Sequence, residues 1–248
     1  MNLDVDDLKP QHFQKISDMV YRSAGINLKQ GKEALVRARL MKRLRSLKIG
    51  RVEEYLDFLD SGQGGREIAR LVDVMTTNQT SFFREMDHFS FLRDTVLPGL
   101  TQARLRFWSA ACSSGEEPYT LAIMLREHLA DVDRRDVRIL ATDISQRMLE
   151  KARRAQYPQA ALEEVPAPQY RKYFTALRSG PPGSVQVAAE ARELVRPAYL
   201  NLMEPWPMRG RFQVVFCRNV MIYFDQPTQH RILARMKPLL KPDGLLFM

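Results

Sequence analysis

Residues 105–129 read LRFWSAACSSGEEPYTLAIMLREHL and join an apolar run to a helical pattern through a loop of small residues. LRFWSA (105–110) is typical of a buried strand, and the stretch from 116 has Leu121, Leu125 and Leu129 in line along a helix. Between them, AACSSGEEP (110–118) allows close backbone approach to a ligand. Ser114 and Glu117 have the S-x-x-E spacing of a capping box. The loop indicates either a nucleotide-sized binding site or a tight strand-to-helix turn.

The same alternation of strand and helix continues downstream. Further strands are expected at 137–142, 194–199, 212–217 and 244–248, and further helices around 146–156 and 226–240. The turn signal RSGPPG (178–183), followed by SVQV, indicates a small antiparallel ribbon inserted before the strand near 194–199. This alternation of strands and helices predicts an α/β chain with a doubly wound, mostly parallel sheet. Such sheets bind ligands beyond the carboxyl ends of their strands.

Residues 1 to about 85 have helical spacing instead. Helices are expected at roughly 10–24, about 30–48, 52–60 and 66–75. Gly25 provides a stop after the first helix. The second carries Val36, Leu40, Leu44 and Leu47 on one arc. An all-α domain over 1–85 is therefore expected to precede the α/β domain over 86–248.

The net charge of +9 is concentrated in the second helix. Between residues 29 and 51 only Glu33 opposes a run of basic residues. The basic residues are Lys29, Lys32, Arg37, Arg39, Lys42, Arg43, Arg45, Lys48 and Arg51. A cationic face of this kind indicates an acidic partner surface, and the alternative is a solvated helix face.

Composition excludes several classes of protein. No apolar run reaches the roughly 18 residues of a membrane span. The histidines His12, His88, His128 and His230 have no metal-ligand spacing, so no metal is expected. The two cysteines form no disulfide framework, which favours a reducing, cytoplasmic setting. Insertion into a membrane is not expected. The basic helix lacks an aromatic platform or groove-reading motif, so no nucleic-acid partner is expected.

Three further segments carry candidate site residues. Asp143 ends the strand in ILATDIS, where an acid can accept hydrogen bonds from ribose hydroxyls or cap a helix. TTNQTSFFRE (76–85) mixes polar residues with two phenylalanines, and is either a binding segment or a hinge with a capping network. In CRNVMIYF (217–224), Asn219 falls where a strand end points a polar side chain into the cleft, and Tyr223 either covers a ligand or packs under the next helix.

TTNQTSFFRE, FWSAACSSGEEPY, ATDIS and FCRNVMIYFDQPTQ, in this order and spacing, resemble the CheR family of chemotaxis receptor methyltransferases. The resemblance extends from AGINL (24–28) to KPDGLLF (241–247). It implies an all-α domain, then a class I methyltransferase sheet with a β-subdomain at about 170–193. The chain departs from the family at Pro197, where members tend to keep an uninterrupted strand.

The resemblance also implies a cofactor, a substrate and site residues. The methyl donor would be S-adenosyl-L-methionine, with S-adenosyl-L-homocysteine as product, and the acceptor a glutamate of a methyl-accepting chemoreceptor's cytoplasmic domain. The β-subdomain could capture a peptide from the receptor's C-terminus, and the enzyme is expected to be a monomer. The implied cofactor contacts are Asn78, Thr80, Arg84, Glu117, Asp143, Asn201, Leu202, Asn219 and Val220. Arg84 and Tyr223 are the candidates for orienting the acceptor carboxylate.

Two rival functions use the same fold. An NAD-type oxidoreductase is disfavoured because the loop has only Gly115 and lacks G-x-G-x-x-G. A non-catalytic methyltransferase-like module of a chemosensory pathway is the other alternative. For the enzyme, no catalytic triad or acid/base pair is expected, because a glutamate carboxylate is already ionised at neutral pH.

Overall fold

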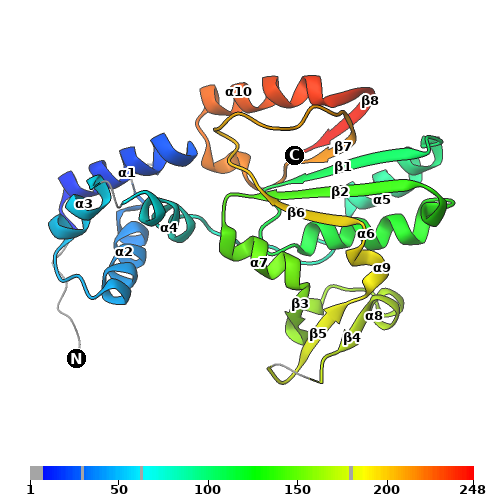
Figure 1. Ribbon diagram of the computed structural model, residues 1–248, viewed down its shortest axis with the longest axis horizontal. Helices are drawn as coiled ribbons and strands as arrows, with labels where there is room; N and C mark the ends of the chain where they lie inside the picture. Colours follow the sequence, from blue (N-terminus) through cyan, green and yellow to red (C-terminus); the bar gives the residue numbers. More distant parts are fainter. Residues whose placement is uncertain (1–7, 29–30, 62–63, 179–180) are drawn as a thin grey trace. The chain divides into compact units, whose positions relative to one another are not determined.

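The computed structural model describes residues 8–28, 31–61, 64–178 and 181–248, which separate into two compact units (Figure 1). We call Met1–Thr77, Asn201–Pro205 and Val220–Leu233 the helical unit. Asn78–Leu200, Trp206–Asn219 and Ala234–Met248 form the sheet unit. Lys29, Gln30 and residues 179–180 of the RSGPPG turn lie outside the described residues.

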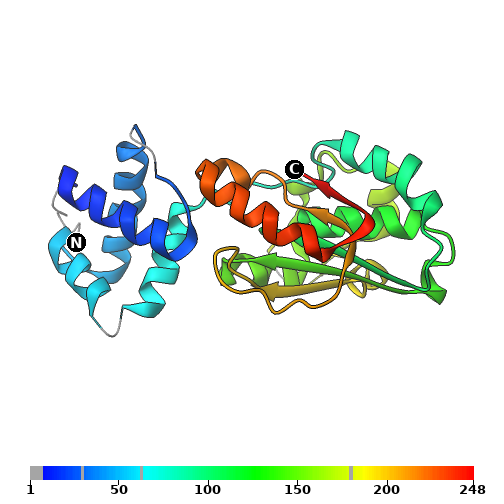
Figure 2. The ribbon, with the colours of Figure 1, turned by 90° about the horizontal axis from the view of Figure 1, so that it is seen from above.

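The helical unit contains the four predicted N-terminal helices, which gather into a bundle (Figure 2). They are α1 (Pro10–Ala24), α2 (Glu33–Leu47), α3 (Val52–Asp60) and α4 (Gly65–Met75). α1 ends where Gly25 adopts φ +70° and donates its N–H to the carbonyl of Tyr21. Glycine reaches this left-handed conformation without a steric cost, so the predicted stop is confirmed.

α2 buries the predicted stripe but uses two of its cations internally. Val36, Leu40 and Leu44 are buried, whereas Leu47 is only half-buried. Arg43 binds both carboxylate oxygens of Glu67, at 2.6 and 2.5 Å. Arg39 donates to the carbonyl of Met75 at 2.7 Å and to Thr77 Oγ1 at 2.9 Å. Arg39 and Arg43 thus hold α2 against α4, and the receptor-facing role of this helix stays a prediction.

The described part of the sheet unit contains a five-stranded parallel sheet in the order β6-β2-β1-β7-β8. Its strands are β1 (Arg104–Ala110), β2 (Asp136–Asp143), β6 (Val195–Tyr199), β7 (Phe212–Phe216) and β8 (Leu240–Phe247). The predicted fold class is confirmed. Pro197 lies in β6, the edge strand beside β2. Proline lacks an N–H and is tolerated at an edge, which explains how this strand forms despite it.

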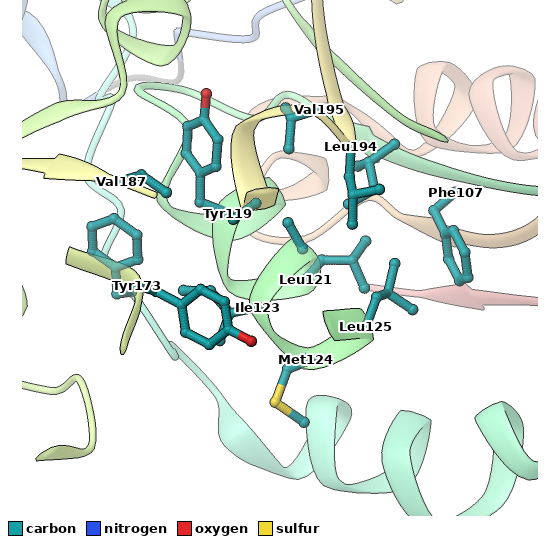
Figure 3. Packing of buried hydrophobic residues seen from close by; sticks show 14 of the residues in the cluster. Phe107, Tyr119, Leu121, Ile123, Met124, Leu125, Tyr173, Val187, Leu194 and Val195 are labelled. Carbon is teal, nitrogen blue, oxygen red and sulfur yellow. The ribbon is translucent and has the colours of Figure 1, made fainter. Parts of the chain in front are cut away.

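α6 (Glu116–His128) is the central helix of the sheet unit's core. Figure 3 shows its Leu121 and Leu125 directed toward Leu194 and Phe107. The helix is buried almost all round its first ten residues, as expected for one enclosed on every side. The other helices are α5 (Met86–Phe91), α7 (Gln146–Arg154), α8 (Ala167–Tyr173), α9 (Ala189–Arg192) and α10 (Gln226–Met236), the last running from the helical unit into the sheet unit.

A second, antiparallel sheet has the order β3-β5-β4. We call it the small sheet; its strands are β3 (Gln156–Pro158), β4 (Phe174–Ala176) and β5 (Ser184–Val187). It begins at Gln156, outside the expected range of about 170–193. The sequence did not indicate β3, because a strand of three residues that ends in Pro158 is too short to show a period-2 pattern. Among the described residues, no helix has the length and apolarity that a membrane crossing requires.

Candidate functional site

The candidate site of the sheet unit is built on unusual backbone at the carboxyl ends of its parallel strands. The left-handed region is occupied at Phe83, Glu85, Ala111, Ser113, Gly115 and Asn219. For a non-glycine residue this conformation costs about 1–3 kcal/mol, and such residues cluster at ligand sites. The three segments that carry them follow β1, follow β7, or lie just before α5. Several strained residues of this unit thus lie where α/β sheets bind ligands, while Asp131 and Ala155 are left-handed elsewhere in it.

The loop after β1 is fixed on both sides. The N–H of Cys112 donates to the carbonyl of Thr142 at 2.9 Å. The Ser113 hydroxyl donates to the carbonyl of Asn78 at 3.0 Å, which ties the loop to the TTNQTSFFRE motif. Gly115 has φ +102°, and a Cβ there would lie 2.9 Å from Ala152 Cβ. Glycine is therefore required at position 115, both for its conformation and for the space that it leaves.

Asp143 ends β2 with a buried carboxylate that accepts two backbone hydrogen bonds. Its Oδ2 accepts from the N–H of Ser113 and its Oδ1 from the N–H of Ser145, both at 2.8 Å. The N-cap of α7 is Ser145, whose hydroxyl accepts from the N–H of Met148. The helix-cap alternative for Asp143 is therefore wrong. A carboxylate at the carboxyl end of a strand is a group that can accept hydrogen bonds from ligand hydroxyls.

The predicted capping box of Ser114 and Glu117 is also wrong. α6 begins with Gly115 as its N-cap, and no side chain makes a capping hydrogen bond there. The Ser114 hydroxyl donates instead to the carboxylate of Glu116, whose two oxygens lie at 3.0 and 2.8 Å. Glu117 accepts from the Ser109 hydroxyl at 2.7 Å and lies 3.4 Å from the guanidinium of Arg218.

Burial governs the electrostatics of these two glutamates. It raises the pKa of Glu117 above its ordinary value of 4.5, while Arg218 and the Ser109 hydroxyl oppose the rise. Burial also raises the pKa of Glu116, opposed first by the hydrogen bond from Ser114. Of the two, Glu117 has a neighbouring arginine within ion-pair distance, so its charged form has direct support.

Arg218 was missed as a site residue by the sequence reasoning. Its side chain is only 2% exposed and lies over the rings of Phe89 and Phe216. It donates to the carbonyl of Arg84 at 2.5 Å and to Glu85 Oε2 at 3.0 Å. A signal was present, because a charged residue directly after the apolar strand FQVVFC stands at the sheet's ligand-binding edge.

Two further candidates, Arg84 and Asn219, neighbour this cation. The side chain of Arg84 is 39% exposed and donates to the carbonyl of Gln79 at 3.2 Å. The Asn219 amide donates to Glu85 Oε1 at 2.9 Å, and with Arg218 it holds the pKa of Glu85 below its ordinary value. Thr80 is half-buried in the same motif as Arg84. Hydrogen bonds and an ion pair thus link the segments that carry Asn78, Arg84, Glu117, Asp143 and Asn219.

The other candidates lie in the helical unit. They are Asn201, Leu202, Val220 and Tyr223. The buried Asn201 amide donates to the carbonyl of Ser23 at 2.8 Å and to Glu204 Oε1 at 3.1 Å. The Tyr223 hydroxyl donates to the carbonyl of Thr77 at 3.3 Å. The predicted site residues are thus divided between the two units.

The parallel sheet, the tight loop after β1 and the acid ending β2 are the features expected of a class I methyltransferase. The family model described as "CheR methyltransferase, SAM binding domain" matches residues 78–248, and "CheR methyltransferase, all-alpha domain" matches residues 11–76. The chain belongs to the CheR methyltransferase family. Its cofactor is S-adenosylmethionine.

Curated relatives agree with this assignment. "Chemotaxis protein methyltransferase 2" of Pseudomonas aeruginosa is 44% identical over 239 residues, covering 96% of this chain and 84% of that protein. "Chemotaxis protein methyltransferase" of Escherichia coli is 42% identical over 241 residues, covering 97% of this chain and 83% of that protein. The corresponding protein of Borreliella burgdorferi is 38% identical, covering 99% and 88%. This chain is a chemotaxis-type methyltransferase, so an oxidoreductase function is excluded.

Proposed function

We propose that this chain methylates glutamate side chains on the cytoplasmic helices of chemoreceptors, giving γ-glutamyl methyl esters. The observation that carries the proposal is the match of both CheR family models, which together cover residues 11–76 and 78–248. The names of the curated relatives support a role in chemotaxis. Nothing favours the non-catalytic alternative. The expected domains, 1–85 and 86–248, would serve receptor recognition and methyl transfer as a monomer in the cytoplasm.

The chemistry needs positioning more than acid/base groups. S-adenosylmethionine supplies a methyl group activated by its sulfonium. A glutamate oxygen forms a bond to the methyl carbon while the carbon–sulfur bond breaks and its electron pair stays on sulfur. The ester and the thioether are both neutral at the reacting atoms, and no proton moves. The protein therefore has to bind, align and exclude water, and alignment can be worth up to about 7–11 kcal/mol.

The donor set fits this cofactor. We assign the ribose hydroxyls to Asp143, whose carboxylate is already oriented by two backbone N–H groups. We assign the methionine ammonium to Glu117, a partly buried acid at the first turn of α6 whose side chain is 15% exposed. Further contacts are assigned to Asn78, Thr80, Arg84, Asn201, Leu202, Asn219 and Val220. Arg84 and Tyr223 would orient the acceptor carboxylate, the first by charge and the second by its hydroxyl.

The proposal is tested by incubating the enzyme with S-adenosylmethionine labelled in its methyl group and a receptor cytoplasmic fragment. Label in the receptor that mild base releases as methanol would identify a methyl ester. Absence of transfer by a protein that binds S-adenosylhomocysteine would favour the non-catalytic alternative.

We propose that α2 docks the acidic receptor helices through its exposed cations. Arg39 and Arg43 are engaged within the helical unit, whereas Lys42 and Arg45 are exposed. Reversing Lys42 and Arg45 to Glu should raise the receptor KM about tenfold at low salt and flatten its dependence on ionic strength. The affinity for S-adenosylhomocysteine should not change.

A matched control reverses two other exposed arginines, Arg209 and Arg211, which lie before the amino end of β7. It makes the same change in net charge at the opposite edge of the sheet from the candidate site. Receptor KM should then stay at the wild-type value. Equal effects of the two double variants would show that net charge alone matters, and no effect of either would leave α2 a solvated face.

We also propose that the small sheet captures the receptor's C-terminal peptide as an added strand. Its outer strands, β3 and β4, each pair with β5 on one side only within the described residues. An open strand edge can accept a peptide through main-chain hydrogen bonds. Receptor with its tail should be methylated at least about threefold faster at low concentration than tail-less receptor. Equal rates would exclude tethering in this enzyme.

A further inference from the structure

One side chain of the small sheet contacts two segments of the cofactor site. The Tyr157 hydroxyl, on β3, donates to the carbonyl of Ser114 in the loop after β1 at 2.8 Å. Its ring meets Phe82 of the TTNQTSFFRE motif edge-on, with centroids 4.9 Å apart and planes at 82°. The loop and the motif are thus both held by a residue that lies more than 40 positions away from either.

The hydroxyl satisfies a carbonyl that lies just outside α6. The N-cap of the helix is Gly115, whose carbonyl accepts from the N–H of Tyr119 at 3.1 Å. Ser114 precedes that N-cap, and Pro118, four positions further on, has no N–H to donate to it. Burial raises the pKa of the Tyr157 hydroxyl well above its ordinary value. The group therefore remains a donor throughout the physiological pH range.

The second outer strand holds the same motif from another side. Phe82 is fully buried and meets Phe174 of β4 edge-on, with centroids 5.2 Å apart. Beside it, the Ser81 hydroxyl donates to Glu164 Oε2 at 2.9 Å. Gly115 closes the arrangement, because a Cβ at that position would lie 2.9 Å from the Tyr157 hydroxyl oxygen. The small sheet is packed into the cofactor segments at both of its outer strands.

We propose that Tyr157 is a positioning residue for the cofactor: it holds the Ser114–Gly115 turn in the conformation that binds S-adenosylmethionine. This inference rests on the proposed cofactor contacts of the loop. It gives the small sheet a second role beside receptor capture. Removing the small sheet would consequently damage the cofactor site, against the simple expectation that an inserted ribbon can be deleted without loss of cofactor binding.

The test compares Tyr157→Phe with Tyr119→Phe. Both are buried tyrosines whose hydroxyls donate to one backbone carbonyl, that of Ala152 at 2.7 Å in the case of Tyr119. We expect Tyr157→Phe to weaken S-adenosylhomocysteine binding about tenfold by calorimetry, because the turn is no longer held in place. Tyr119→Phe should lower the Tm by a similar amount and leave the affinity within about twofold of the wild type.

Steady-state kinetics distinguishes a positioning role of Tyr157 from a purely structural one, because only a positioning role should change the KM for S-adenosylmethionine selectively. In Tyr157→Phe the KM for S-adenosylmethionine should rise while the receptor KM stays constant. Equal losses of affinity in the two variants, or none in Tyr157→Phe, would overturn the positioning role. Failure of the wild-type protein to bind S-adenosylhomocysteine would instead overturn the proposed cofactor contacts, and this inference with them.

Discussion

Replacing Asp143 with Ala is expected to weaken S-adenosylhomocysteine binding by about 30-fold or more. Hydrogen bonds that involve a charged group are worth about 1.5–3 kcal/mol, and the ribose would lose such bonds. The loss should be larger than this contact alone, because Asp143 also orients the loop through Ser113 and the start of α7 through Ser145. Titration calorimetry on the folded variant measures the change.

Asp136 provides the matched control at the other end of the same strand. Its carboxylate is half-exposed and pairs with Arg106 at the amino end of β2. Asp136→Ala removes the same group from the same strand and should leave the affinity unchanged. Asp143→Asn should fall between wild type and Asp143→Ala, since one oxygen can still accept a backbone N–H. Wild-type affinity in Asp143→Ala would remove this residue from the cofactor site.

Replacing Arg218 with Met should lower the Tm by about 10 °C at neutral pH. Removing one partner of a buried ion pair costs about 3–5 kcal/mol, and a domain of this size loses about 2–4 °C per kcal/mol. Met keeps apolar contact with Phe89 and Phe216, so the loss is one of charge rather than of packing. The carboxylate most affected is Glu117, whose pKa is already raised by burial.

The sign of the pH dependence follows from that pKa. A carboxyl group with a raised pKa in the folded state favours folding when it is protonated, and its stabilisation is lost as pH rises through the folded pKa. Without Arg218 this pKa rises further, so the variant should lose more stability at pH 8 than at pH 6. Adding Glu117→Gln should recover part of the Tm and flatten the profile. A stability loss that is the same at both pH values and is not relieved by Glu117→Gln would contradict the ion-pair account.

The periodicity of the sequence predicted most of the secondary structure. The helix expected at 10–24 coincides with α1, and the strand expected at 105–110 with all but the first residue of β1. These elements bury one face or are buried on both, so apolar spacing reports them directly. β3 was not predicted, because it has only three residues and pairs with a strand far along the chain, so the sequence shows no local pattern there.

The site was harder to predict because its geometry depends on long-range partners. Arg218 meets Glu85 133 residues away, and Tyr157 meets Ser114 43 residues away. The Ser114–Glu117 spacing suggested a capping box, but the left-handed Gly115 moved the start of the helix. The order of the motifs was enough to predict which loops lie at the ligand-binding edge of the sheet. Which side chains pair with one another could be seen only in the three-dimensional structure.

The most direct test of the account is methyl transfer itself. The enzyme, labelled S-adenosylmethionine and a receptor cytoplasmic fragment would be compared with the same fragment after Gln replaces its candidate glutamates. We predict label in the first fragment only, released as methanol by mild base, because a γ-glutamyl methyl ester hydrolyses readily. Label that survives base, or equal labelling of the Gln-substituted fragment, would contradict glutamate esterification.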